Sequence, residues 1–117
     1  MAGTATISIT GAITGVPAGV KTVGPFTVSN TASGGSITDQ TLTAGTNTVS
    51  VPVGGTYKGV IILPPSGNTN ALTLRGVGGD TGVGLHLTDP TVLGISTSVT
   101  SFVINAGAST LTEFLWY

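Results

Sequence analysis

The chain has 117 residues, a formal net charge of −1 at pH 7 and only 6% charged residues, against about 25% in a typical soluble protein. Its three Lys and Arg residues exclude a basic patch that could neutralise the ~6–10 phosphates of a usual DNA contact. We therefore expect one domain, no nucleic-acid partner, and little charge repulsion to oppose self-association.

Membrane insertion, secretion and thiol chemistry find no support in the sequence. The longest continuous apolar run is residues 60–65, far short of the ~20 residues of a membrane-spanning helix, so we expect no membrane partner. The first residues, MAGTATISITG, lack the basic start and apolar centre of a secretory signal. The chain has no Cys, so neither disulfides nor thiolates contribute.

The first thirty residues predict two strands with an irregular segment between them. Residues 4–10 (TATISIT) alternate, with Ile7 and Ile9 on one face, as in a half-buried strand. Residues 11–19 contain Pro17 and three glycines, which predicts a connecting loop or an extended arm. An N-terminal arm of this kind could take in residues 1–20 and reach a neighbour. Residues 23–30 predict the second strand, with Phe26 and Val28 facing the core.

The middle of the chain predicts three further strands. Residues 37–42 follow a turn cluster, and Ile37 and Leu42 are their expected core positions. Residues 48–53 place three valines on one face, while Pro52, which cannot donate to a ladder, predicts an edge strand or a strand end. Residues 57–63 lead into the continuous apolar run that begins at residue 60. Such a run predicts a strand covered on both faces, or one with one face against a neighbouring subunit.

The remaining segments complete an all-β pattern. Residues 70–87 predict two half-buried strands joined by a glycine-rich turn, and residues 91–95, 99–105 and 111–117 predict one strand each. In residues 99–105, Phe102 and Ile104 share a face. The whole chain predicts a single all-β domain over residues 1–117, either a small β-sandwich or a jelly-roll-like barrel of about nine short strands.

The glycine-rich turn is the segment that most resembles a nucleotide-binding motif. Its glycines at positions 76, 78 and 82 do not have the Gly-x-Gly-x-x-Gly spacing, and a strand rather than a helix is expected to follow. The Lys of a phosphate-binding loop is also missing. We expect Asp80 instead to cap the turn through nearby backbone N–H groups, and we expect no bound cofactor.

The few ionisable residues offer weak catalytic and metal-binding patterns. His86 and Asp89 are three residues apart, but a zinc site needs three or four ligands and the chain has one His and four acidic residues. The nucleophile motif Gly-x-Ser-x-Gly is missing. Asp39, Asp80 and Asp89 lie in separate predicted turns, whereas calcium takes 6–8 oxygen ligands. We therefore expect no catalytic residues, no metal site and no enzymatic activity.

The C-terminus concentrates aromatic residues. Phe114, Trp116 and Tyr117 are three of the six aromatic residues and lie within the last four positions. One interpretation places Phe114 and Trp116 in the core of a final strand. The other makes the three rings a subunit or capsid interface, where aromatic side chains contribute large contact energies. The sequence leaves both interpretations open.

Three segments carry a family resemblance, namely residues 22–38 (TVGPFTVSNTASGGSIT), the run from 51 to 95 and the terminal TEFLWY. They resemble small virion structural proteins of tailed bacteriophages, including capsid decoration (cement) proteins. The resemblance implies a β-rich subunit, commonly a homotrimer, in a virion that is assembled in the host cytoplasm. Its partner would be the major capsid protein or another virion protein.

From these observations we expect a non-enzymatic decoration protein that stabilises the head through apolar and backbone contacts. The alternative is a receptor- or carbohydrate-binding module of a tail or fibre. Such a module would need a shallow site with exposed aromatic rings, and aromatic residues are scarce outside the C-terminus.

Overall fold

A computed structural model describes residues 3–16 and 19–117 of the chain. These residues form ten β-strands and no helix, so the described part also contains no helix that could cross a membrane. The strands are β1 (Ala5–Val16), β2 (Gly19–Asn30), β3 (Ser36–Leu42), β4 (Gly45–Ser50), β5 (Gly59–Leu63), β6 (Leu72–Arg75), β7 (Val83–Gly84), β8 (Thr91–Gly94), β9 (Ser101–Ala106) and β10 (Thr110–Trp116). The all-β prediction is confirmed, with ten strands in place of about nine.

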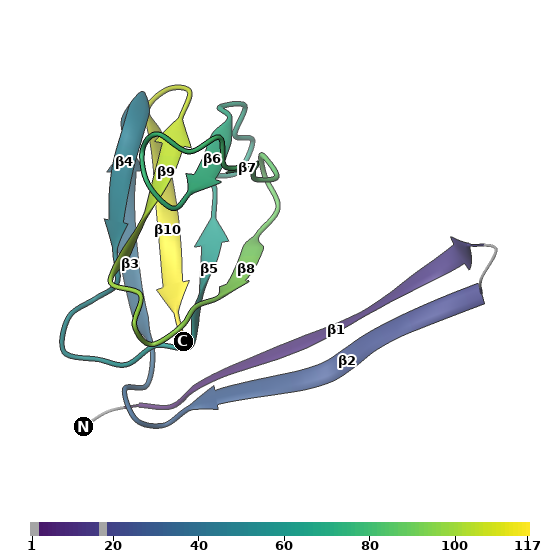
Figure 1. The fold of residues 1–117 in the computed structure, drawn as a ribbon. Helices are drawn as coiled ribbons and strands as arrows, with labels where there is room; N and C mark the ends of the chain where they lie inside the picture. The colour runs from purple at the N-terminus through teal and green to yellow at the C-terminus, as the bar shows by residue number, and fades with distance from the viewer. Residues whose placement is uncertain (1–2, 17–18) are drawn as a thin grey trace.

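Strands β3 to β10 form a compact body of two four-stranded sheets, which Figure 1 shows above a long hairpin. In the body the first strand pairs with the last, the second with the seventh, the third with the sixth and the fourth with the fifth, all antiparallel. The resulting orders, β3-β10-β5-β8 and β4-β9-β6-β7, are those of a jelly roll. The body is therefore an eight-stranded β-sandwich with jelly-roll topology.

The core lies between the two sheets and is centred on Trp116. Its ring lies 6.1–6.3 Å from the rings of Tyr57, Phe102 and Phe114, within the range of favourable aromatic pairs. The indole Nε1 donates a hydrogen bond of 2.9 Å to Oγ1 of Thr38, which satisfies its one polar group. Because Phe102 belongs to β9 and Trp116 to β10, this cluster holds the two sheets together.

The last residue continues the ladder between β10 and β5. The backbone N–H of Tyr117 donates to the carbonyl of Gly59, and the Tyr117 carbonyl accepts from the N–H groups of Lys58 and Gly59. A side chain at position 59 would collide with the Tyr117 hydroxyl, so glycine is required for this close approach. The C-terminal residue is thus an integral part of the body.

Strands β1 and β2 form a two-stranded sheet of their own, which leaves the body as a long arm (Figure 1). The segment predicted as a connecting loop or an extended arm, residues 11–19, continues the strands as far as Val16 and again from Gly19. Pro17 lies outside the described residues. The arm therefore comprises both strands, and the expected arm boundary at residue 20 falls inside β2. Residues 1 and 2 of the predicted arm also lie outside the described residues.

Two predicted inward positions are wrong. Phe26 is 58% exposed and Ile37 is 67% exposed, because strand alternation shows which residues share a face but not whether a second layer covers that face. Val53, predicted to continue the valine face of residues 48–53, lies beyond the end of β4 at Ser50 and is 98% exposed. Pro52 follows that end, which confirms its predicted place next to a strand terminus.

Candidate interaction surface

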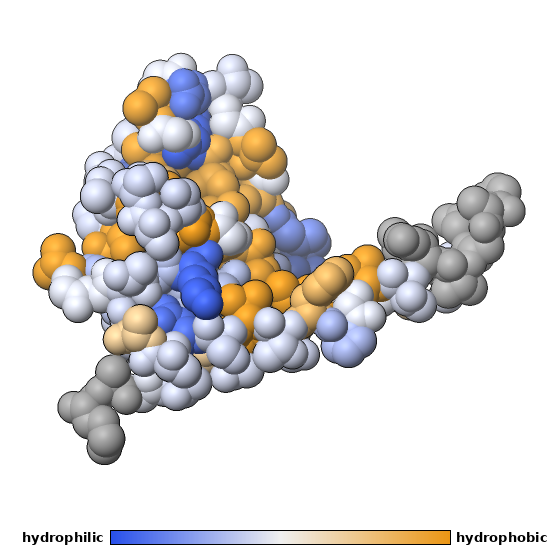
Figure 2. Space-filling model, turned by 60° about the horizontal axis from the view of Figure 1, so that its bottom comes forward, coloured by the Kyte–Doolittle hydropathy of each residue, from blue (hydrophilic) through white to orange (hydrophobic). Residues whose placement is uncertain are grey.

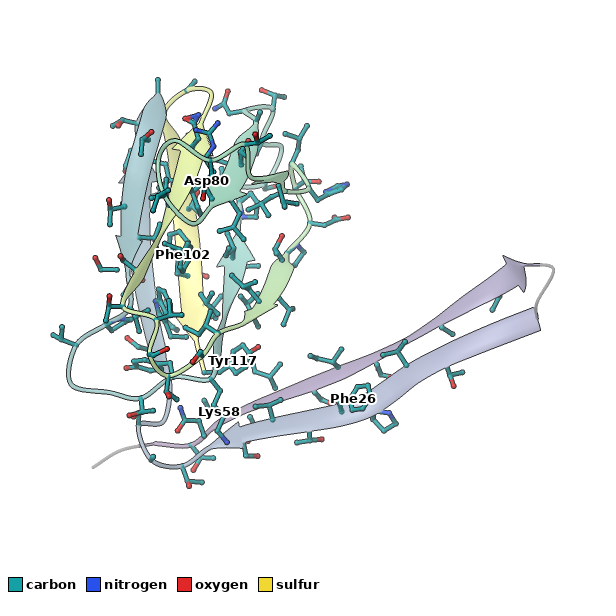
Figure 3. The ribbon with its side chains drawn as sticks, viewed as in Figure 1. Phe26, Lys58, Asp80, Phe102 and Tyr117 are labelled. Carbon is teal, nitrogen blue, oxygen red and sulfur yellow. The ribbon has the colours of Figure 1, made fainter. Side chains whose placement is uncertain are left out.

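The arm has one apolar face and one hydroxyl-bearing face. Ile7 pairs with Val28 and Ile9 with Phe26, and directly paired residues share a face of the hairpin. The residues between them, Thr and Ser on both strands, occupy the opposite face. Phe26 is the exposed member of the six aromatic residues, the other five being buried. Figure 3 shows it on the arm, away from the body, whereas Phe102 lies inside the body.

A β-bulge extends this apolar face. The pair after Ile9 and Phe26 is Gly11 with Val23, so β2 has one residue more than β1 in this interval. Gly24 lies in the bulge with a φ of 79°, and a Cβ there would collide with the carbonyl oxygen of Ile9, so the position requires glycine. Regular alternation from Phe26 would place Gly24 on the apolar face. The bulge places the exposed Val23 there instead.

The root of the arm is fastened to the body by buried and charged hydrogen bonds. Asn30, only 2% exposed, donates from Nδ2 to the carbonyl of Thr56 at 2.7 Å and accepts from two backbone N–H groups of the following turn. The Lys58 ammonium donates to the carbonyl of Ser29 at 2.7 Å, and Figure 3 shows this side chain reaching β2. These bonds fix the direction in which the arm leaves.

The outer face of the β3-β10-β5-β8 sheet carries an apolar row that crosses all four strands. Leu115 lies opposite Ile37 on one side and Ile61 on the other, and Ile61 lies opposite Val92. Ile37 and Val92 are exposed, and Leu115 and Ile61 are half-buried. The other face of these strands is covered by the second sheet, while no described residue covers this row completely.

Two carboxylates lie beside this row. Asp39 on β3 is directly opposite Glu113 on β10, which in turn is opposite Leu63. Like charges in this position destabilise a sheet. Two carboxylates fall short of the 6–8 oxygens that calcium prefers, and the other loop acids, Asp80 and Asp89, lie in different turns. The described residues contain no group of three or more His, Cys, Asp and Glu side chains that could hold a metal ion.

A groove connects the arm to the row. It has a volume of about 450 Å³ and is lined by Ala5 and Ile7 of the arm and by Ile37 and Leu115 of the body, among others. In Figure 2, hydrophobic residues lie along the arm and in the angle where it meets the body. The apolar face of the arm and the row on the outer sheet are therefore parts of one apolar surface.

Two of the C-terminal aromatic residues, Trp116 and Tyr117, also line this groove, but they expose little surface. Phe114, Trp116 and Tyr117 are each 4% exposed or less, so the structure places them in the core, the first of the two interpretations left open above. That interpretation concerned Phe114 and Trp116, and Tyr117 is buried beside them. Burial also raises the pKa of the Tyr117 hydroxyl above its ordinary value of 10.0.

His86, Asp89 and Asp80, the residues with weak catalytic or metal-binding patterns, make their contacts within their own turns. Nδ1 of His86 accepts hydrogen bonds from the backbone N–H groups of Thr88 and Asp89 and lies 3.5 Å from the Asp89 carboxylate, and both side chains are largely exposed. Asp80 accepts from the N–H of Val77 at 3.1 Å, which confirms the predicted cap of the glycine-rich turn (Figure 3). Each contact is local and structural.

The apolar row was not predicted as a surface. Its four residues come from four separate strands, and only the register between those strands aligns them. One signal was present in the sequence. The continuous apolar run of β5 was interpreted either as a strand covered on both faces or as one that faces a neighbouring subunit. Ile61 and Leu63 of that run lie on the outer face and are half-buried, which rules out complete coverage within the chain.

The chain matches no family model, no curated protein and no solved structure. Its function has to be argued from its own residues.

Proposed function

We propose that this chain is a non-enzymatic structural protein of a tailed-bacteriophage virion, and specifically a decoration protein that adds contact area on a capsid. The observation that carries the proposal is the arm, whose apolar face has no second layer among the described residues and leaves Phe26 58% exposed. A two-stranded hairpin alone is at best marginally stable in water. Contact with another surface is therefore expected both to stabilise the arm and to be its purpose.

The ionisable residues support a role without catalysis. General acid–base catalysis needs a positioned donor or acceptor of protons close to the substrate. The chain has one His and four acidic residues, and Nδ1 of His86 is occupied by backbone N–H groups of its own turn. Asp80 is likewise engaged with Val77.

The jelly-roll topology is compatible with this role but does not decide it. Viral capsid subunits and lectin domains both use this fold, and a fold alone does not fix a function. The alternative, a receptor- or carbohydrate-binding module, needs exposed rings against which a sugar can stack. Five of the six rings are buried, so the binding of a capsid lattice is the better supported function.

The protein would act by adding contacts between capsid subunits and would catalyse no reaction. A rigid oligomer, expected to be a trimer, would contact several capsid subunits at once, and each additional contact would act at high effective concentration. Low charge on the protein suits apolar and backbone contacts of this kind.

Purified virions provide the test. The protein should be found in them by mass spectrometry, and cryo-electron microscopy should show its density on the outside of the head. Purified protein added to particles that lack it should bind, and Phe26→Asp should weaken that binding far more than Val53→Asp, which also adds a charge at an exposed apolar residue. Absence from virions, or equal effects of the two substitutions, would contradict the proposal.

A further inference from the structure

We propose that the arm of one copy packs its apolar face across the outer-sheet row of a second copy, the row formed by Ile37, Leu115, Ile61 and Val92. This inference concerns contact between copies of the chain and does not depend on the virion role proposed above.

The two surfaces match in length. The row crosses four strands, which at ~4.8 Å between neighbouring strands makes about 14 Å. On the arm, the apolar face runs from Ile7 to Val23, the partner of Gly11. Four residues along a strand at ~3.4 Å each also make about 14 Å. The apolar face can therefore lie on the row along its whole length, from Ile7 to Val23.

In the sequence, the formal charges of the arm and of the outer sheet are of opposite sign. Residues 5–30 of the arm carry one formal charge, the positive charge of Lys21, whereas the outer sheet carries the facing carboxylates Asp39 and Glu113. The other two cations of the chain are engaged elsewhere, Lys58 with a carbonyl of the arm root and Arg75 with the carbonyl of Gly78. Opposite charges on the two partners favour their encounter.

The arm does not cover the row of its own chain. Asn30 and Lys58 fasten the arm root, and Figure 1 shows the arm leading away from the body. Ile37 and Val92 of the row remain exposed.

A second copy is the partner that carries both uncovered surfaces, so a single contact covers the arm of one subunit and the row of the next. A contact of this kind between unlike surfaces closes into a ring when its rotation permits. The expected trimer would be such a ring.

Sedimentation of the full chain tests the inference through paired variants. We expect an oligomer at micromolar concentration and a dissociation constant at least about 30-fold higher after Phe26→Asp or Ile37→Asp, as for the loss of an interface hot spot. Thr27→Asp, on the other face of the arm, and Val53→Asp, on an exposed apolar residue outside both surfaces, are the matched controls. All four positions are exposed, so the substitutions should leave the fold intact.

Cross-linking locates the contact. The chain has no Cys, so single cysteines can be placed without background. Phe26→Cys mixed with Val92→Cys should give a disulfide-linked pair of different variants under mild oxidation. Thr27→Cys mixed with Val92→Cys should give far less, because its side chain faces away from the row.

Several results would overturn the inference. One is a chain that remains monomeric at micromolar concentration. Another is an oligomer that neither Phe26→Asp nor Ile37→Asp weakens. A third is equal cross-linking from positions 26 and 27. A monomer that still binds capsids would overturn this inference alone, whereas an oligomer that binds no virion part would overturn the proposed function alone.

Discussion

Phe26 in the arm and Phe102 in the body occupy strands of the same kind but differ in their surroundings. Each lies opposite an apolar residue of the paired strand, Ile9 for Phe26 and Val49 for Phe102, yet Phe102 is 7% exposed and Phe26 is 58% exposed. The body has a second sheet over the inner face, and the arm has none. A strand's apolar face becomes core only when another layer covers it. The arm is thus a single layer, whereas the body has two.

The largest expected effect is the loss of stability when the body, rather than the arm, is truncated. Removal of residues 114–117 should unfold the chain, because truncation of one buried Phe or Trp to Ala already costs about 3–5 kcal/mol of a total stability of about 5–15 kcal/mol. A thermal melt followed by circular dichroism measures this. A chain without residues 1–28, which keeps Asn30, should melt close to the intact protein. Equal losses in the two truncated chains would show that the arm contributes to the core.

The joint between the two regions should show an intermediate effect. Asn30→Ala leaves the Thr56 carbonyl and two backbone N–H groups without their partner, and such a loss costs about 1–3 kcal/mol. Urea unfolding should detect it, and limited proteolysis should cut the arm sooner. Thr31→Ala, at the exposed next residue, is the control. If both variants behave alike, the root bonds do not hold the arm.

The shape of the arm depends on one glycine. Gly24→Ala forces a side chain into a left-handed backbone conformation, which costs about 1–2 kcal/mol, and into contact with the Ile9 carbonyl. We expect weaker association between copies and an unchanged melting temperature of the body. Gly11→Ala has open space around the added Cβ and should change neither property. A lower melting temperature for Gly24→Ala would mean that the bulge contributes to the stability of the body.

A smaller effect is expected at alkaline pH and lies in the body. Burial raises the pKa of Tyr117 above 10.0, so above pH 10 the unfolded chain loses this proton while the folded chain keeps it. Stability therefore falls as the pH rises through that range, and Tyr117 has no such effect at lower pH, where both states are protonated. Urea unfolding at about pH 8 and about pH 11 should show a smaller decrease in Tyr117→Phe. The same decrease in both proteins would assign it to other groups.

The smallest effect should come from the one histidine. His86→Ala removes an exposed acceptor of its own turn, and surface changes of this kind usually alter stability by less than about 0.5 kcal/mol. Capsid binding and self-association should both be retained. A folded His86→Ala protein that has lost its function would argue for a catalytic or binding role that we do not expect.

The sequence predicted the inside of the body better than its outside. Leu42 was expected in the core and is buried, and Phe102 and Ile104, which were expected to share a strand face, are both buried. Phe114 and Trp116 are buried as the core interpretation of the C-terminus has them, because large apolar residues two apart in a strand need a common cover. Asp80 was correctly predicted as a turn cap, because that hydrogen bond is local.

The predictions failed where the answer depended on distant strands. Phe26 and Ile37 have the same alternation as core residues, and only the absence of a second layer distinguishes them. The apolar row depends on the register among β3, β10, β5 and β8, which no single segment contains. The arm was predicted too short, since its glycines and Pro17 resembled a loop.

The central position of β10 has a consequence for how the chain folds. This strand lies between β3 and β5, although it is the last of the ten to be synthesised. Its sheet therefore cannot close until residues 110–117 have left the ribosome, and pairing across so much sequence is slow. During that interval the apolar faces of β3 and β5 have no cover, which favours aggregation. The arm precedes the body in the chain, so its apolar face is uncovered during that interval as well.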